Sequence, residues 1–71
     1  MIDLIIERIK ELCEEKGISY YRLAKLSHIS PNTLNYIMSK RNTDIKFATL
    51  ERLCDGLGIT VKDFFCNKKF N

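Results

Sequence analysis

The hydrophobic residues near the start of the chain recur with the spacing of one helix face. They occupy positions 2, 5, 6, 9, 12 and 13, while Glu, Lys and Arg residues fill the opposite face. This spacing predicts an amphipathic α-helix. Gly17 follows the pattern and suits the left-handed conformation that ends many helices. We therefore expect a first helix that begins near Ile2 and ends before Gly17.

Two short helices are predicted next, with a tight turn between them. Ser19 and Ser30 are both suited to the N-cap position, where a hydroxyl oxygen accepts a hydrogen bond from a backbone amide. Pro31 suits the first helical position, which needs no amide donor. The residues expected to face the core are Leu23, Ala24 and Leu26 in the first of these helices, and Leu34, Ile37 and Met38 in the second.

The last third of the chain predicts a fourth and a fifth helix. The apolar face of the fourth is formed by Phe47, Leu50, Leu53, Cys54 and Leu57. Gly56 and Gly58 close this segment, and Gly58 is the better candidate for a left-handed end. Thr60 and Asp63 resemble a capping box at the start of a helix that runs through Phe64 and Phe65. No strand-type alternation occurs, so the sequence predicts an all-α fold of five helices.

The length of the chain, 71 residues, leaves room for one hydrophobic core. We expect a single domain over 1–71, with its core at about 4–66 and a frayed tail at 67–71. No apolar run approaches the roughly 18 residues that span a bilayer. The first ten residues mix apolar and charged side chains, unlike a secretory signal. These features predict a cytoplasmic protein without membrane contact.

The cysteines and the single histidine give little indication of metal chemistry. Cys13, Cys54 and Cys66 are an odd number, widely spaced, and each lies in an apolar helical context. We expect reduced, buried thiols rather than disulfides. The three cysteines with His28 lack the close ligand pairs of structural zinc sites. No metal or other cofactor is therefore predicted.

Charge is distributed unevenly along the chain. Residues 1–15 contain five acidic and two basic residues, whereas residues 16–46 contain six basic residues and one acidic residue. A polyanion would dock against the basic part. An ordinary solvated surface also explains these six cations, and charge alone favours that simpler interpretation.

The segment from Ser19 to Arg41 resembles the helix-turn-helix of the Cro/phage-repressor (XRE-type) family. The family places a small residue at Ala24, a turn residue with positive φ at His28, and apolar residues at Leu23, Leu34 and Ile37. The ending GLGITVKDFF also resembles the end of that family's domain. The resemblance covers roughly residues 5 to 65 and implies a compact, lambda-repressor-like DNA-binding domain.

The chain departs from the family pattern at several positions. His28 stands where the family prefers Gly; His is among the non-glycine residues enriched in the left-handed region, so a turn role is favoured over a ligand role. Lys40 replaces a Gly that the family commonly has after the helix beginning at Pro31, and Ile45-Lys46 replaces a Pro-containing pair before the fourth helix. Tyr20 replaces a frequent Gln. These departures concern the loops and one phosphate contact rather than the fold.

The resemblance implies that the helix beginning at Pro31 enters the major groove of duplex DNA. With Leu34 and Ile37 inward, its outer residues are Pro31, Asn32, Thr33, Asn35 and Tyr36. Among these, Asn32, Thr33 and Tyr36 match base-reading positions, and Asn35 lies between bases and backbone. Asn suits adenine and the Thr methyl suits thymine, which favours A·T-containing sites. Base contact is the favoured interpretation; the alternatives are helix-start capping and first-turn propensity for Asn32 and Thr33, and packing on neighbouring residues for Tyr36.

Phosphate contacts are expected from two places. Amides at the start of the second helix can bind a phosphate, with Ser19 and Tyr20 beside them. After the recognition helix, Lys40, Arg41, Asn42 and Lys46 are expected to meet the DNA backbone. Arg22 and Lys25 are either further phosphate contacts or ordinary solvated side chains.

The sequence therefore predicts a DNA-binding transcriptional regulator, with repression as the default mechanism. One domain contacts about one half-site, so we expect a homodimer on a pseudo-palindromic operator. The candidates for its interface are Phe64, Phe65 and Phe70, or Ile2 and Ile6. The alternatives are an antitoxin-like or other protein-interaction module, and a purely structural helical domain. No catalytic motif is present, and no small-molecule ligand is predicted.

Overall fold

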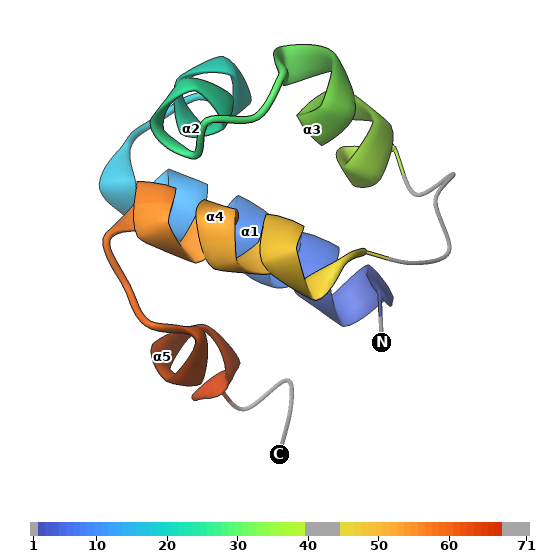
Figure 1. Ribbon diagram of the computed structural model, residues 1–71. Coiled ribbons are helices and arrows are strands. Elements are labelled where there is room, and N and C mark those ends of the chain that lie inside the picture. The colour runs from blue at the N-terminus through green and yellow to red at the C-terminus, as the bar shows by residue number, and fades with distance from the viewer. Residues whose placement is uncertain (1, 40–44, 68–71) are drawn as a thin grey trace.

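Five helices form the part of the chain that the computed structural model describes, residues 2–39 and 45–67. They are α1 (Ile2–Lys16), α2 (Tyr20–Leu26), α3 (Pro31–Met38), α4 (Phe47–Leu57) and α5 (Val61–Phe65). In Figure 1, α1 and α4 cross the middle of the molecule, α2 and α3 lie on one side of them, and α5 lies on the other. The predicted all-α architecture is confirmed.

Hydroxyl side chains begin three of the helices. The oxygens of Ser19, Ser30 and Thr60 each accept a hydrogen bond from the amide three residues later, at 3.2, 3.0 and 3.0 Å respectively. Pro31 is the first residue of α3, where its missing amide hydrogen costs nothing. These three caps and the position of Pro31 agree with the sequence prediction.

Three helices end in the same way, with one residue in the left-handed region. Gly17 (φ 65°), His28 (φ 57°) and Gly58 (φ 73°) follow α1, α2 and α4. The next residue is an isoleucine each time, and its amide returns to a carbonyl five residues earlier: Ile18 to Cys13 (3.1 Å), Ile29 to Ala24 (3.1 Å) and Ile59 to Cys54 (3.0 Å). Each isoleucine also packs against the core. This is the Schellman arrangement, and His28 adopts it without being glycine.

The core joins all five helices. Its buried side chains include Ile5, Ile9, Leu12 and Cys13 from α1, Leu23 and Ala24 from α2, Leu34 from α3, Leu50, Leu53, Cys54 and Leu57 from α4, and Phe64 from α5. Ala24 is fully buried, in agreement with its predicted role at a close approach of helices. The core therefore fixes the orientation of α2 and α3 relative to the other helices.

Several predicted burials are wrong. Leu26 and Phe47, both expected to face the core, are instead 43% and 61% exposed. Cys66 is an exposed free thiol at the end of α5, whereas Cys13 and Cys54 are buried and free as expected. Gly56 does not close α4 but lies inside it, and Gly58 ends the helix.

The candidates for a dimer interface also change. Ile6 and Phe64 are completely buried within the domain, so neither can contact a second copy without unfolding. Phe65 is half-buried against the core, with its ring edge-on to that of Phe64 at a centroid distance of 5.1 Å. Phe70 and the side chain of Ile2 lie outside the described part of the structure.

Arg8 is buried, although the helical pattern assigned it to the charged, solvent-facing side of α1. Its Nε donates to the carbonyl of Phe64 at 2.8 Å, and its Nη2 donates to the carbonyl of Asp63 at 3.2 Å. Its Nη1 pairs with the Glu11 carboxylate at 2.6 Å. The same carboxylate oxygen accepts from the side-chain amide of Asn67 at 3.2 Å. Arg8 therefore holds α5 against α1.

Candidate nucleic-acid interface

The outer face of α3 is polar and open to solvent. Asn32, Thr33, Asn35 and Tyr36 are all exposed, and Pro31 is half-buried at the start of the helix. The inward residues Leu34 and Ile37 are 0% and 3% exposed. The structure thus brings the five predicted base-reading residues together on one short helix, whose opposite face is fixed by the core.

Thr33 has a local role as well as an exposed position. Its amide donates to the Ser30 hydroxyl, and the two hydroxyl oxygens lie 3.1 Å apart in a further hydrogen bond. The capping explanation is therefore correct for the Thr33 hydroxyl. The methyl group of Thr33 takes no part in this cap, and a methyl group can make an apolar contact with thymine.

The start of α2 carries polar and basic side chains that are open to solvent. The Ser19 hydroxyl accepts from the amide of Arg22, and a hydroxyl that accepts one bond can still donate another. The side chains of Ser19 and Arg22 are exposed. Tyr21, which the sequence analysis did not single out, is 60% exposed beside these groups, and the Lys25 ammonium lies 5.4 Å from its ring centroid. In the sequence, Tyr21 is marked as one of two adjacent tyrosines at the start of α2.

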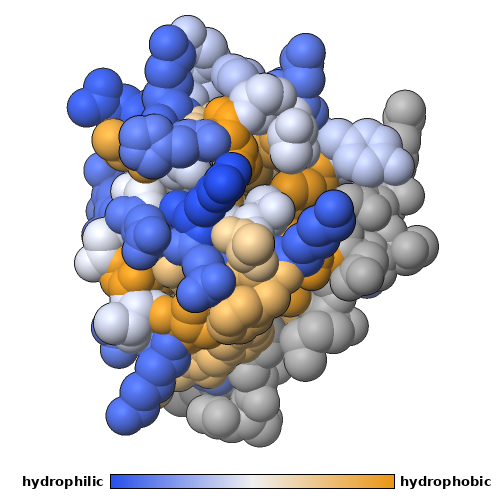
Figure 2. Space-filling model, in the orientation of Figure 1, coloured by the Kyte–Doolittle hydropathy of each residue, from blue (hydrophilic) through white to orange (hydrophobic). Residues whose placement is uncertain are grey.

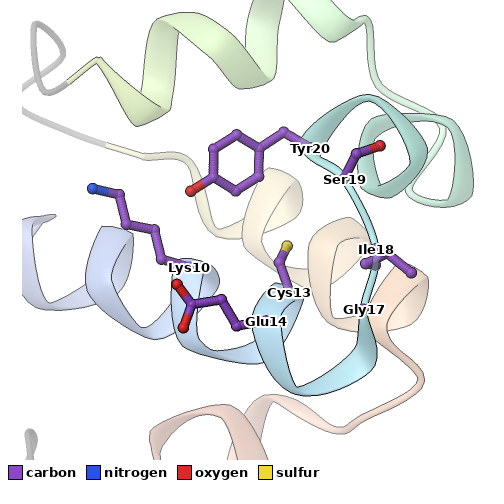
Figure 3. Close-up of a pocket in the computed structure, with 7 residues that line it drawn as sticks. All are labelled: Lys10, Cys13, Glu14, Gly17, Ile18, Ser19 and Tyr20. Carbon is purple, nitrogen blue, oxygen red and sulfur yellow. The ribbon is translucent and has the colours of Figure 1, made fainter.

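Tyr20 is less open than its neighbours. Its ring packs against the core cluster, and in Figure 3 it extends over α1, with its hydroxyl toward the side of Lys10 and Glu14. It lines an open cleft of about 370 Å³, formed by Lys10, Cys13, Glu14, Gly17, Ile18, Ser19 and Tyr20. Burial, followed by the charges of Cys13 and Glu14, raises the pKa of the Tyr20 hydroxyl. A tyrosine hydroxyl is already protonated at neutral pH, and this shift leaves it a hydrogen-bond donor.

The remaining predicted phosphate contacts lie after α3. Lys46 is exposed and precedes the first residue of α4, where its backbone occupies the N-cap position. Lys40, Arg41 and Asn42 lie outside the described residues. On the face shown in Figure 2, hydrophilic side chains gather mainly at the top and left of a central area in which apolar atoms reach the surface.

Two short helices joined through one left-handed residue, the second with an open polar face, define a helix-turn-helix domain. The model of the Cro/C1-type HTH DNA-binding domain matches residues 8–66. The chain belongs to this family, which confirms the resemblance found in the sequence and makes the protein a member of a DNA-binding, regulatory class.

A solved structure supports the same assignment. The crystal structure of the prophage Lp1 protein 11 is similar to this chain with a TM-score of 0.87 and 27% sequence identity, over 99% of this chain and 92% of that one. No curated protein matches the chain significantly. Within the described residues, every helix is too short or too polar to cross a membrane.

Proposed function

We propose that the protein is a sequence-specific regulator of transcription that reads duplex DNA with α3. The observation that carries the proposal is the contrast between the two faces of this helix. Leu34 and Ile37 are buried, whereas Asn32, Asn35 and Tyr36 are exposed. A helix held by its apolar face and open on its polar face can enter the major groove without rearrangement.

Each predicted contact has a role in this proposal. Asn32, Thr33 and Tyr36 read base edges, with Asn35 and Pro31 beside them. Phosphates are bound by Ser19, Tyr20 and Arg22, which precede α3 in the sequence, and by Lys40, Arg41, Asn42 and Lys46, which follow it. Phosphate contacts set the register, and base contacts set the sequence preference. The Asn and Thr side chains favour A·T pairs.

The expected binding unit is a homodimer on a pseudo-palindrome. Residues 1–71 act as one domain, with a core at about 4–66, and one such domain covers about one half-site. Two domains then meet half-sites about 34 Å apart, one helical turn of DNA. A dimer of this size represses by occupying DNA that polymerase needs, and as a regulator of genomic DNA it works in the cytoplasm.

Selection of bound sequences from random duplexes tests the proposal most directly. We expect a recovered motif with two related half-sites and A·T pairs opposite α3. Affinity for this motif should fall with salt, at a log–log slope near about −4.5 for five phosphate contacts. If no motif is recovered and the affinity for duplex DNA does not depend on salt, the DNA-binding proposal is contradicted. A protein-interaction module is then favoured.

Two sets of variants separate base contacts from phosphate contacts. Asn32→Ala and Tyr36→Ala should weaken binding to the selected motif by about tenfold or more and leave binding to scrambled duplex nearly unchanged. The double substitution of Lys40 and Arg41 by Ala should weaken binding to both duplexes and reduce the salt slope by about 1.8. Lys62→Ala is the matched control, because this exposed cation lies on α5, across the molecule from α3 (Figure 1).

A further inference from the structure

Gly56 lies inside α4 although nothing in its own backbone requires glycine. The glycines with positive φ are Gly17 and Gly58, so Gly56 is not among them. A glycine within a helix is less favourable than alanine by about 1 kcal/mol. The reason for Gly56 must therefore be the space around it rather than its conformation.

That space is filled by the turn between α2 and α3. A Cβ atom added to Gly56 would lie 3.0 Å from the backbone nitrogen of Ser27 and 3.2 Å from the carbonyl carbon of Leu26, and it would overlap the Ser27 hydroxyl. The Ser27 hydroxyl has little free space to move into, because the residue is 1% exposed, and the two backbone atoms cannot retreat unless the whole turn moves. α4 and the turn are therefore in direct backbone-to-backbone contact at this point.

Ser27 is the residue through which this contact reaches the helix-turn-helix. It is the C-cap of α2, its amide donates to the Leu23 carbonyl at 2.9 Å, and its side chain is 1% exposed. In the described part of the chain its hydroxyl is buried without a hydrogen-bond partner. The next residue is His28, whose left-handed conformation turns the chain toward α3.

We propose that Gly56 is a positioning residue for DNA reading. Without a side chain at residue 56, the turn rests directly on α4, and this contact sets the orientation of α3 relative to the rest of the domain. The inference rests on the proposed function, because it matters for binding only if α3 reads bases. A functional constellation must be held to within about 0.5 Å. A displacement of the turn by a methyl group is therefore expected to disturb base contacts more than phosphate contacts.

Four variants test the proposal by equilibrium binding to the selected duplex and to a scrambled duplex of equal length. Gly56→Ala introduces the overlap, Ser27→Ala removes the hydroxyl, and Gly56→Ala with Ser27→Ala combines them. Gly58→Ala is the matched control: its Cβ meets nothing within 4 Å, but its φ of 73° strains any side chain. Gly58→Ala is therefore expected to lower the stability of the domain without displacing the turn between α2 and α3.

Gly56→Ala should reduce affinity for the selected duplex by about tenfold, which is the effect of losing one base contact. Its affinity for the scrambled duplex should fall much less. The double variant should recover part of this loss, since the largest overlap is gone. Ser27→Ala and Gly58→Ala should keep the wild-type ratio of the two affinities. The proposal is overturned if Gly56→Ala binds both duplexes like the wild type or loses equal affinity for both. It is also overturned if adding Ser27→Ala to Gly56→Ala restores neither binding nor folding.

A second measurement does not depend on DNA. Residual dipolar couplings in solution report the orientation of α3 relative to α4. We expect a changed orientation in Gly56→Ala, a partial return in the double variant and none in Gly58→Ala. If the wild-type protein binds no specific duplex but the couplings change as expected, the proposed function fails and the positioning role of Gly56 stands. Unchanged couplings overturn the positioning role whatever the DNA result.

Discussion

Replacement of Arg8 by methionine should destabilise the domain strongly, although the residue is a cation on an amphipathic helix. Methionine keeps the apolar stem of the side chain but removes every donor. The carbonyl of Phe64 then loses a buried bond of 2.8 Å, and the carbonyl of Asp63 loses a partly buried bond of 3.2 Å. Because both acceptors belong to the backbone, no side-chain change can remove them.

The expected loss in the free energy of unfolding is about 2–4 kcal/mol. A buried hydrogen bond from a charged donor contributes about 1.5–3 kcal/mol, and a partly buried bond about 1 kcal/mol. The ion pair adds little, because the Glu11 side chain is 33% exposed and water can solvate it. The total is a large fraction of the roughly 4–10 kcal/mol expected for a domain of this size.

Urea unfolding followed by far-ultraviolet circular dichroism measures this loss. With a slope of about 1 kcal/mol per molar urea, the midpoint should fall by about 2 M or more. The control is Glu11→Gln, which keeps both carbonyl bonds of Arg8 and should cost less than about 1 kcal/mol. A loss below 1 kcal/mol for Arg8→Met, or equal losses for the two variants, would refute the reasoning.

Three further predictions concern the turn and the thiols. His28→Gly should raise the free energy of unfolding by up to about 1 kcal/mol in urea titrations, because it relieves a left-handed side chain, whereas His28→Val should lower it. Under native conditions at a pH of about 8, an uncharged alkylating reagent should label the exposed Cys66 at least about tenfold faster than Cys13 or Cys54, as peptide mass spectrometry would show; equal rates would contradict the burial. Burial, followed by the charges of Asp55 and Glu51, raises the pKa of the Cys54 thiol from 9.0 to about 11. The folded state thus favours the protonated thiol, so its contribution to stability is full below pH 9.0 and falls as the pH approaches 11; Cys54→Ala should flatten this decline in unfolding experiments.

The features that the sequence predicted correctly are those set by local interactions. The caps at Ser19, Ser30 and Thr60 depend on a hydroxyl and an amide three residues apart. The left-handed residue His28 and the buried face of α3 follow from motifs of similarly short range. Because these features depend only on residues that are close together in the sequence, a single sequence is enough to recognise them.

The features that the sequence did not predict depend on distant partners. Arg8 bonds to carbonyls more than fifty residues away, which no helical period reveals. Phe47 belongs to an apolar face, but periodicity does not say whether another element covers the start of that face. The sequence pattern indicates a helix end at Gly56, because its packing partner, Ser27, is close to it only in the folded chain. On α3 the sequence predicted which residues are exposed, and their contacts with DNA stay a prediction.

The three matching helix ends have a consequence for the order of folding. Each closes through hydrogen bonds within a few residues, so α1, α2 and α4 can define their lengths before any tertiary contact forms. The attachment of α5 through Arg8 instead requires closure of nearly the whole chain, which is entropically expensive. We expect α5 to dock after the transition state. In stopped-flow experiments Arg8→Met should then accelerate unfolding and leave the refolding rate almost unchanged.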